Sequence, residues 1–241
     1  MAKQKHDNLG NISRRARHNE AIKPKTALEP KSALGMLKKF QGPKFDQSVE
    51  VVMVLGVDTK QADQMIRGSV SLPKGIGKSK KVIAFCNDDQ KAAALENGAI
   101  KAGGQDLVEE VEKGFLDFDV AVASPDMMRV MAKLGKVLGP KGLMPSPKNG
   151  TVTPGVAQAV KEFAAGKVEY RTDKAGNVQA IIGKMSFSED DLLENLNHFI
   201  ETIERARPSS VKGVYVKKIV VSGSMTPGVQ LRYEDAAAAA A

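Results

Sequence analysis

The sequence predicts an α/β protein of two domains, in which a Rossmann-like domain is inserted into an α+β domain built from both ends of the chain. Three observations support this architecture. Short apolar strands and helices alternate through the middle of the chain, and longer alternating strands with single helices lie on both sides of that segment. Glycine-containing basic stretches mark the passages between the two patterns. We predict an outer domain from residues 1–75 and 167–241 and an inserted domain from residues 76–166.

The first part of the outer domain begins with a basic arm. Residues 1–28 contain seven Lys or Arg residues and almost no apolar periodicity, which predicts a flexible segment. It either orders on a phosphate backbone or remains a solvated tail. Pro30 then opens a helix with an apolar face that ends at Phe40. Phe45–Val57 is predicted as a strand, followed by a short helical piece from Asp58 to Arg67 and an extended segment at residues 70–72.

The middle of the chain predicts a parallel sheet with helices on its faces. The strands are expected at Val82–Cys86, Ala99–Ala102 and Phe118–Ala123. The helices are expected at residues 88–97, 106–113, 124–134 and 154–165. The stretch Leu134–Pro154 contains four glycines and four prolines, so we predict an ordered loop or turns there, without a helix or central strand. Gly75, Gly77 and Gly166 are predicted to form a hinge where two strands cross between the domains.

The last part of the chain returns to the outer domain. Two strands, Lys167–Thr172 and Asn177–Met185, are predicted to form a hairpin around residues 173–176. Ser188 begins a capping box and an amphipathic helix that ends before Pro208. A final strand is expected at Gly213–Ser222.

The charge distribution favours an anionic partner. The chain has 36 Lys and Arg against 28 Asp and Glu, a net charge of +8, and the excess lies within the first 75 residues. Two glycine-containing basic segments, residues 73–81 and 134–154, carry lysines without acids. This pattern suits binding to nucleic acid or, alternatively, a solvated connection. The candidate binding lysines are Lys78, Lys80 and Lys81 in the first basic segment and Lys136, Lys141 and Lys148 in the second.

Signals for catalysis are weak. Residues 72–79 nearly match a phosphate-binding loop, which leaves a nucleotide-binding enzyme as the alternative function, but a strand follows where that loop needs a helix. His6, His18 and His198 are scattered, so we expect no metal and no cofactor. Cys86 is the sole cysteine and fits core packing in a reducing compartment. Because neither a membrane-length apolar run nor a secretory signal is evident, we expect a cytoplasmic protein that is not an enzyme.

Several segments, taken in order from Phe45 to Gly228, resemble the family of the universal large-subunit ribosomal protein numbered one, which forms the mobile stalk beside the tRNA exit site. The most specific piece is G-P-K-G-L-M-P at residues 139–145. The other segments are F-D-Q-S-V-E-V (45–51), D-Q-M-I-R-G-S-V-S-L-P-K-G (63–75), F-D-V-A-V-A-S-P-D-M-M (118–128), Y-R-T-D-K-A-G (170–176) and K-G-V-Y-V-K-K (212–218).

The resemblance implies a monomeric two-domain protein that binds 23S rRNA and assists release of deacylated tRNA. It also implies repression of the protein's own operon mRNA. The RNA-binding residues that it implies are Lys44, Phe45, Ser48, Arg171, Asp173, Lys174, Ser222, Ser224, Met225 and Thr226. Thr226 stands where the family usually has glycine, and core packing is the alternative role for Phe45 and Met225.

Overall fold

The structure, a computed structural model, describes residues 13–233, so residues 1–12 of the predicted arm lie outside the described residues. The chain divides into two compact units. Unit 1 comprises the residues up to Gln64 and those from Asp173 onward, and unit 2 comprises Met65–Thr172. The predicted boundaries lie at 75/76 and 166/167, so the two divisions differ by the short segments that enter and leave unit 2.

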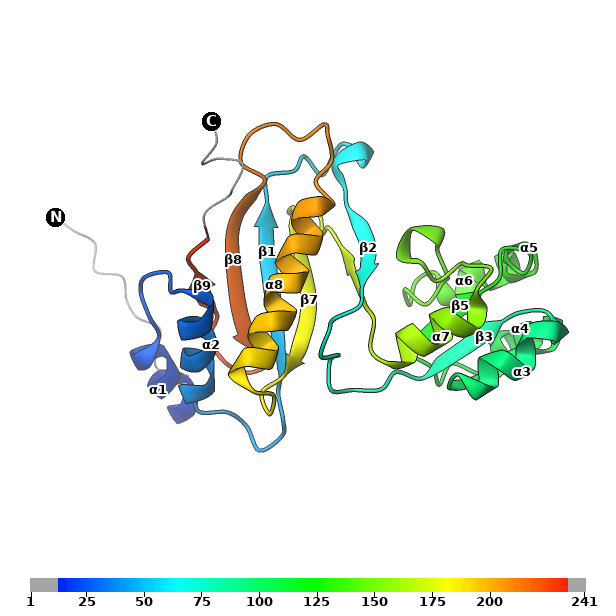
Figure 1. Ribbon diagram of the computed structural model, residues 1–241, viewed down its shortest axis with the longest axis horizontal. Coiled ribbons are helices and arrows are strands. Elements are labelled where there is room, and N and C mark those ends of the chain that lie inside the picture. The colour runs from blue at the N-terminus through cyan, green and yellow to red at the C-terminus, as the bar shows by residue number, and fades with distance from the viewer. Residues whose placement is uncertain (1–12, 234–241) are drawn as a thin grey trace. The chain divides into compact units, whose positions relative to one another are not determined.

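Unit 1 is built on a four-stranded antiparallel sheet in the order β7-β1-β8-β9 (Figure 1). Its strands are β1 (Ser48–Leu55), β7 (Asn177–Lys184), β8 (Val216–Gly223) and β9 (Val229–Leu231). Alternate residues of β1 are buried, as expected for a sheet with one covered face. The predicted strand Phe45–Val57 is therefore correct at its centre, but it begins at Ser48 and leaves Phe45 outside the sheet.

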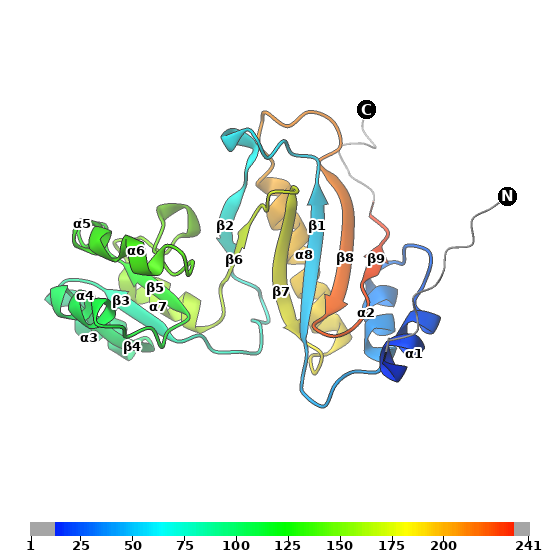
Figure 2. The ribbon, with the colours of Figure 1, turned by 180° about the vertical axis from the view of Figure 1, so that it is seen from behind.

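Two helices cover one face of this sheet. Helix α2 (Pro30–Lys39) packs against α8 (Glu189–Arg205), and both contact the strands, as Figure 1 shows. The Ser188 hydroxyl accepts the Asp191 N–H at 3.0 Å, which confirms the predicted helix start. Figure 2 shows the opposite face, where residues such as Glu50, Val52 and Gln179 remain partly or fully exposed. We call it the open face.

The predicted flexible arm is wrong for residues 14–22, which form helix α1 (Arg14–Ile22). The Ser13 side chain caps this helix by accepting the Ala16 N–H at 3.2 Å. Asn19 then fixes it to the chain after α2, because its side-chain amide exchanges two hydrogen bonds of 2.8 and 2.9 Å with the backbone of Gln41. Asn19 is only 1% exposed. A polar anchor of this kind leaves no apolar periodicity in the sequence.

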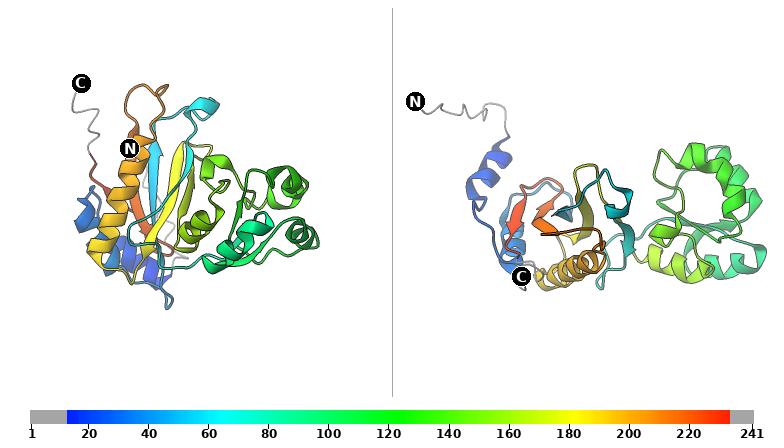
Figure 3. Two further views of the ribbon diagram at one scale, coloured as in Figure 1. Left: turned by 45° about the vertical axis from the view of Figure 1, so that its right-hand side comes forward. Right: turned by 90° about the horizontal axis from the view of Figure 1, so that it is seen from above.

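Unit 2 contains the predicted parallel sheet, with strands in the order β4-β3-β5. They are β3 (Val82–Phe85), β4 (Ala99–Gly103) and β5 (Val120–Ala123). Helices α3 (Asp88–Glu96) and α7 (Val156–Ala164) pack on one face, and α4 (Gln105–Glu112) and α5 (Met128–Met131) on the other (Figure 3). Successive β3 residues contribute to opposite cores, which explains why this strand is continuously apolar.

The stretch Leu134–Pro154 is more regular than predicted. A 3₁₀ turn η3 (Ala132–Leu134) continues directly into α6 (Gly135–Leu138), because Leu134 and Leu138 are both completely buried in the core. A second turn, η4 (Pro147–Asn149), precedes Val152, which forms a parallel bridge to Ala123 at the edge of β5. The expectation of an ordered loop or turns without a helix was therefore wrong at residues 135–138, where α6 forms, whereas the turn η4 agrees with it. Core packing and one strand bridge outweigh the glycine and proline content.

The predicted hairpin around residues 173–176 is also wrong. The turn itself exists, closed by a 3.2 Å bond from the Gly176 N–H to the Asp173 carbonyl. Its two flanking strands belong to different sheets, however: β6 (Val168–Arg171) pairs with β2 (Arg67–Val70), whereas β7 pairs with β1. The helical piece predicted through Arg67 is limited to η2 (Ala62–Gln64), since Arg67 already lies in β2. Within residues 13–233, no helix is long and apolar enough to cross a membrane.

Candidate nucleic-acid interface

The antiparallel pairing of β1 and β8 brings two distant segments together at one end of the sheet of unit 1. Val49 pairs with Gly223, so the turn after β8 lies beside the residues that precede β1. The Ser48 carbonyl accepts the Ser224 N–H at 3.1 Å. We call this region the sheet-end cluster. Its members are Lys44, Phe45, Ser48, Lys184, Ser222, Ser224, Met225 and Thr226.

Gln47 holds the cluster together from beneath. Its side chain is buried, and its Oε1 atom accepts the Met225 N–H at 2.8 Å. Its backbone carbonyl accepts the Met185 N–H at 2.9 Å, so three segments meet at this residue. Sequence reasoning missed Gln47. A signal was present, because it has the same parity as the buried residues Val49 and Val51 of β1.

The cluster presents two apolar side chains to solvent. Phe45 and Met225 are each 55% exposed, although both are large and apolar. Core packing, the alternative role considered for both residues, is therefore wrong. Exposed apolar side chains held by an ordered backbone are suited to contact with a ligand.

Hydroxyl and ammonium groups lie beside these apolar side chains. Lys184 was not predicted, and its Nζ donates to the Ser48 Oγ at 3.0 Å. The sequence gives no sign of this contact, since it depends on the register that pairs Ser48 with Lys184 across β1 and β7. Ser222 pairs with Glu50 on the open face. The cluster thus combines exposed apolar side chains, hydroxyl groups and positive charge, and it contains no buried catalytic group.

Thr226 is compatible with this turn although it stands in place of a glycine. It does not have a positive φ, so its conformation requires no glycine. Its Oγ1 accepts the Gly223 N–H at 2.8 Å, and its N–H donates to the Gly223 carbonyl at 3.2 Å. Thr226 therefore closes the turn that carries Ser224 and Met225.

Asp173 and Lys174 lie at the other end of the sheet. The Gly176 carbonyl accepts the Leu55 N–H at 3.0 Å, which places their turn seven residues along β1 from Ser48. At the rise of an extended chain this is a distance of about 23 Å. The predicted RNA-binding residues of unit 1 therefore form two groups.

The Asp173 carboxylate is occupied by its own turn. Its Oδ1 accepts the N–H groups of Asn177 and Ala175, each at 2.8 Å. The bond from the Asn177 backbone is the main reason that the pKa of Asp173 is lowered. The Lys174 side chain is exposed, and the backbone carbonyl of Lys174 accepts a 3.0 Å hydrogen bond from the Thr59 hydroxyl. Arg171 belongs to unit 2, where it pairs with Arg67 across β6 and β2.

Two lysines of the first basic segment are committed to contacts within unit 2. Lys80 Nζ donates to the Lys167 carbonyl at 2.7 Å, and burial lowers the pKa of Lys80. Lys81 Nζ contacts both carboxylate oxygens of Asp117 at 2.6 and 2.7 Å. The segment looked free of acids because Asp117 is distant in sequence. Lys78 is exposed, but no helix begins after it, so the phosphate-binding loop lacks its essential element.

The second basic segment is held rigidly while its lysines face solvent. The buried Asn149 accepts the Arg67 Nε–H at 2.6 Å and donates to the Glu169 carboxylate. Burial raises the pKa of Glu169. Lys136, Lys141 and Lys148 are exposed and make no ion pair with any residue that the structure describes. This segment therefore presents positive charge on an ordered support.

Other candidate chemical groups are poorly placed for catalysis. Cys86 is completely buried, and burial raises the pKa of its thiol, which disfavours the reactive thiolate. Among residues 13–233, no group of three His, Cys, Asp or Glu side chains could hold a metal ion. The described part of the chain defines a basic, two-unit α/β protein whose most distinctive surface is an apolar and hydroxyl-rich sheet end.

Comparison with known proteins identifies the family. Residues 37–227 match the Ribosomal protein L1p/L10e family. The chain is 51% identical over 202 residues to "Large ribosomal subunit protein uL1" of a Nocardioides species, an alignment that covers 84% of each chain. It is also 51% identical over 218 residues to the protein of the same name from Pediococcus pentosaceus, covering 90% of this chain and 94% of that protein. The chain belongs to the Ribosomal protein L1p/L10e family.

Proposed function

We propose that this chain is a structural component of the large ribosomal subunit and binds 23S rRNA through the sheet-end cluster. The observation that carries the proposal is that Phe45 and Met225, each 55% exposed, lie at the same end of the sheet beside the hydroxyl and ammonium groups of the cluster. The relatives that are named as large-subunit proteins support the assembly to which we assign it.

The chemistry of the cluster suits folded RNA. Specific recognition of RNA relies on unstacked bases, 2′-hydroxyl groups and backbone shape, which a protein contacts with flat apolar groups and hydroxyls. Phe45 and Met225 supply the apolar surfaces, and Ser48, Ser222 and Ser224 supply hydroxyl groups. Lys44, Lys184 and the exposed lysines of the second basic segment (Lys136, Lys141 and Lys148) add salt-dependent phosphate contacts.

The finer roles that we propose follow from the family resemblance. The protein belongs to the mobile stalk near the tRNA exit site and assists release of deacylated tRNA. It also represses translation of its own operon, because a messenger that mimics the ribosomal site can occupy the same cluster. In this proposal the free protein is a cytoplasmic monomer without enzymatic activity, and nucleotide binding at residues 73–81 is not favoured because β3 follows that segment.

Alanine substitution tests the cluster. We expect Phe45→Ala and Met225→Ala each to weaken binding to a large-subunit rRNA fragment by roughly 1–3 kcal/mol, as for loss of a stacking contact. Val214→Ala is the matched control, because Val214 is also 50% exposed in unit 1 but lies before β8, away from the cluster. Filter-binding titration measures the affinities, and circular dichroism verifies the fold. Wild-type affinity in folded Phe45→Ala and Met225→Ala proteins would contradict the assignment.

A further inference from the structure

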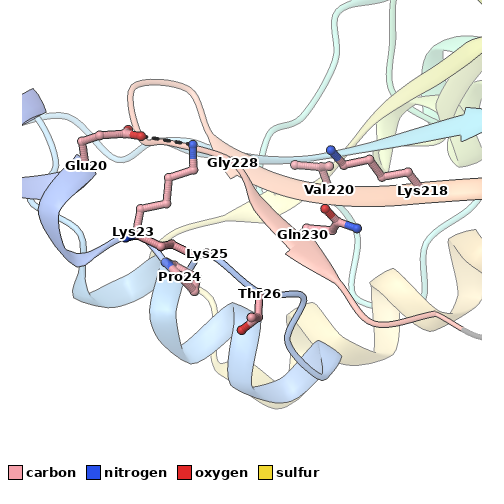
Figure 4. A pocket seen from close by; sticks show the side chains of 9 residues that line it. All are labelled: Glu20, Lys23, Pro24, Lys25, Thr26, Lys218, Val220, Gly228 and Gln230. Atoms are coloured by element: carbon pink, nitrogen blue, oxygen red, sulfur yellow. Dashed lines mark hydrogen bonds and ion pairs between the residues drawn. The ribbon is translucent and has the colours of Figure 1, made fainter. Parts of the chain in front are cut away.

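Unit 1 contains a groove whose lining includes none of the predicted RNA-binding residues. It lies between the chain that follows α1 and the last two strands, and has a volume of about 570 Å³. Figure 4 shows Glu20 and Lys23 on the side of the arm, with Lys218, Val220 and Gln230 extending from the sheet on the other side. Lys25 lines the groove as well. We call it the lysine groove.

The lysine groove is positively charged. Three lysines line it, and Glu20 is its single acidic residue. Glu20 contacts Lys23 at 3.5 Å and offsets its charge, so Lys25 and Lys218 carry the net positive charge of the groove. Within residues 13–233, neither Lys25 nor Lys218 forms an ion pair or a side-chain hydrogen bond. Two ammonium groups are therefore available to an anion.

The groove is continuous with the open face. Val220 pairs with Val52 and with Gln230, and Lys218 pairs with Val54, so these residues belong to adjacent rows of the sheet. The next row toward the sheet-end cluster contains Ser222. Lys218 and Ser224 are six residues apart along the same strand direction, which corresponds to about 20 Å. One extended strand of RNA can span this distance.

The occupant must combine negative charge with groups that tolerate a partly apolar surface. Val220 and Pro24 offer apolar contact between the lysines, and Gln230 and Thr26 offer hydrogen bonds. A nucleic-acid backbone provides phosphates at regular intervals, with sugars and bases between them. A free inorganic anion uses the charge alone and leaves the remainder of the groove without a function.

We propose that the lysine groove binds the phosphate backbone of the RNA that occupies the sheet-end cluster, with Lys25 and Lys218 as the principal phosphate contacts. This inference rests on the proposed function. It extends the RNA footprint across the open face to the arm after α1. The arm therefore acts as part of the binding surface, and the anchoring of α1 by Asn19 sets the position of one wall of the groove.

The test is the salt dependence of RNA affinity in the Lys25→Gln/Lys218→Gln variant of the full chain. Removal of two phosphate contacts should reduce the slope of log K against log salt concentration by about 1.4–1.8, and should weaken affinity at low salt. The control is Lys113→Gln/Lys161→Gln, which makes the same charge change at exposed positions on α4's end and on α7. Lys25→Arg/Lys218→Arg should retain the wild-type slope.

Lysine acylation of the wild-type protein provides a second readout that does not depend on variants. RNA should protect Lys25 and Lys218 from the reagent, whereas Lys113 should remain reactive. Equal protection by inorganic phosphate at the same phosphate concentration would overturn the proposal in favour of a free-anion site. A slope that matches the control variant would also overturn it. If the Phe45→Ala and Met225→Ala variants still lose affinity, the proposed function survives and only the groove is refuted.

Discussion

Gln47 determines the shape of the sheet-end cluster without being exposed in it. Its side chain is 4% exposed, and its Oε1 accepts a 2.8 Å hydrogen bond from the Met225 N–H. Without this acceptor the turn after β8 loses its tie to the residues before β1. A buried neutral side chain therefore positions an exposed apolar one.

We predict that Gln47→Ala destabilises the protein by roughly 1–3 kcal/mol, because it leaves a cavity and removes the partner of a backbone N–H. RNA affinity should also fall, although Gln47 itself is shielded from the ligand. Urea unfolding followed by circular dichroism measures the first effect and filter binding the second. Gln179→Ala, an exposed substitution on β7, is the control and should change the free energy of unfolding by less than about 0.5 kcal/mol. Unaltered stability in Gln47→Ala would contradict this account.

At the scale of single residues, the sequence suggested candidate contact residues but did not indicate which of them lie close together in space. Phe45, Ser48, Ser224 and Met225 meet at one sheet end because of the β1–β8 register, which no local pattern encodes. Asp173 was grouped with them, yet its carboxylate accepts hydrogen bonds within its own turn at the far end of β1. Periodicity predicts which face a strand residue occupies, but it cannot say which strands pair.

At the scale of elements, the inserted parallel sheet was predicted most accurately. Strands β3 and β5 are apolar on both faces, and the strands of this sheet are separated by helices of ordinary length, so composition and length agree. The helices that were not predicted depend on specific contacts: Asn19 anchors α1, and the burial of Leu138 holds α6. Strand β9, which was not predicted, has only three residues. Its pairing with β8 compensates for its short length.

The second basic segment gives an element-scale prediction. Asn149 joins η4 to β2 and β6 through Arg67 and Glu169. Asn149→Ala should lower the stability of unit 2 by roughly 1–3 kcal/mol, because hydrogen bonds to charged, partly buried groups are lost. Hydrogen exchange of β2 and β6 amides measures the local effect, and urea unfolding the global one. Lys148→Ala changes the adjacent exposed residue and should leave both unchanged; equal exchange rates in the two variants would contradict the anchoring role.

At the scale of the whole molecule, the hinge at Gly75, Gly77 and Gly166 remains a prediction. All three glycines have positive φ and lie within unit 2. A Cβ atom on Gly166 would lie 2.8 Å from Ile76 Cγ1, so the two crossing segments are in close contact. Any rotation about these residues must separate that contact. The positive φ values and the tight approach both explain why glycine is required there.

The chain's division into two units leads to a prediction about where RNA specificity resides. Ile66 and Thr172 exchange hydrogen bonds of 3.0 and 3.1 Å, so the two ends of unit 2 are adjacent and a short Gly-Ser linker can replace residues 65–172. The shortened protein keeps the complete sheet β7-β1-β8-β9 and its covering helices. It should therefore fold and should retain salt-resistant affinity for the rRNA fragment within about tenfold of the full chain, because the contacts to specific RNA features remain.

The complementary fragment, residues 65–172, provides the contrast. It keeps both cores of its parallel sheet and the exposed lysines of the second basic segment. Its RNA binding should consist of phosphate contacts alone, and should therefore weaken steeply as salt increases and vary little with RNA sequence. Filter binding of both proteins at two salt concentrations distinguishes the cases. If the fragment retained the specific affinity and the folded shortened protein lost it, the sheet-end cluster could not be the specific surface, because Phe45 and Met225 belong entirely to unit 1.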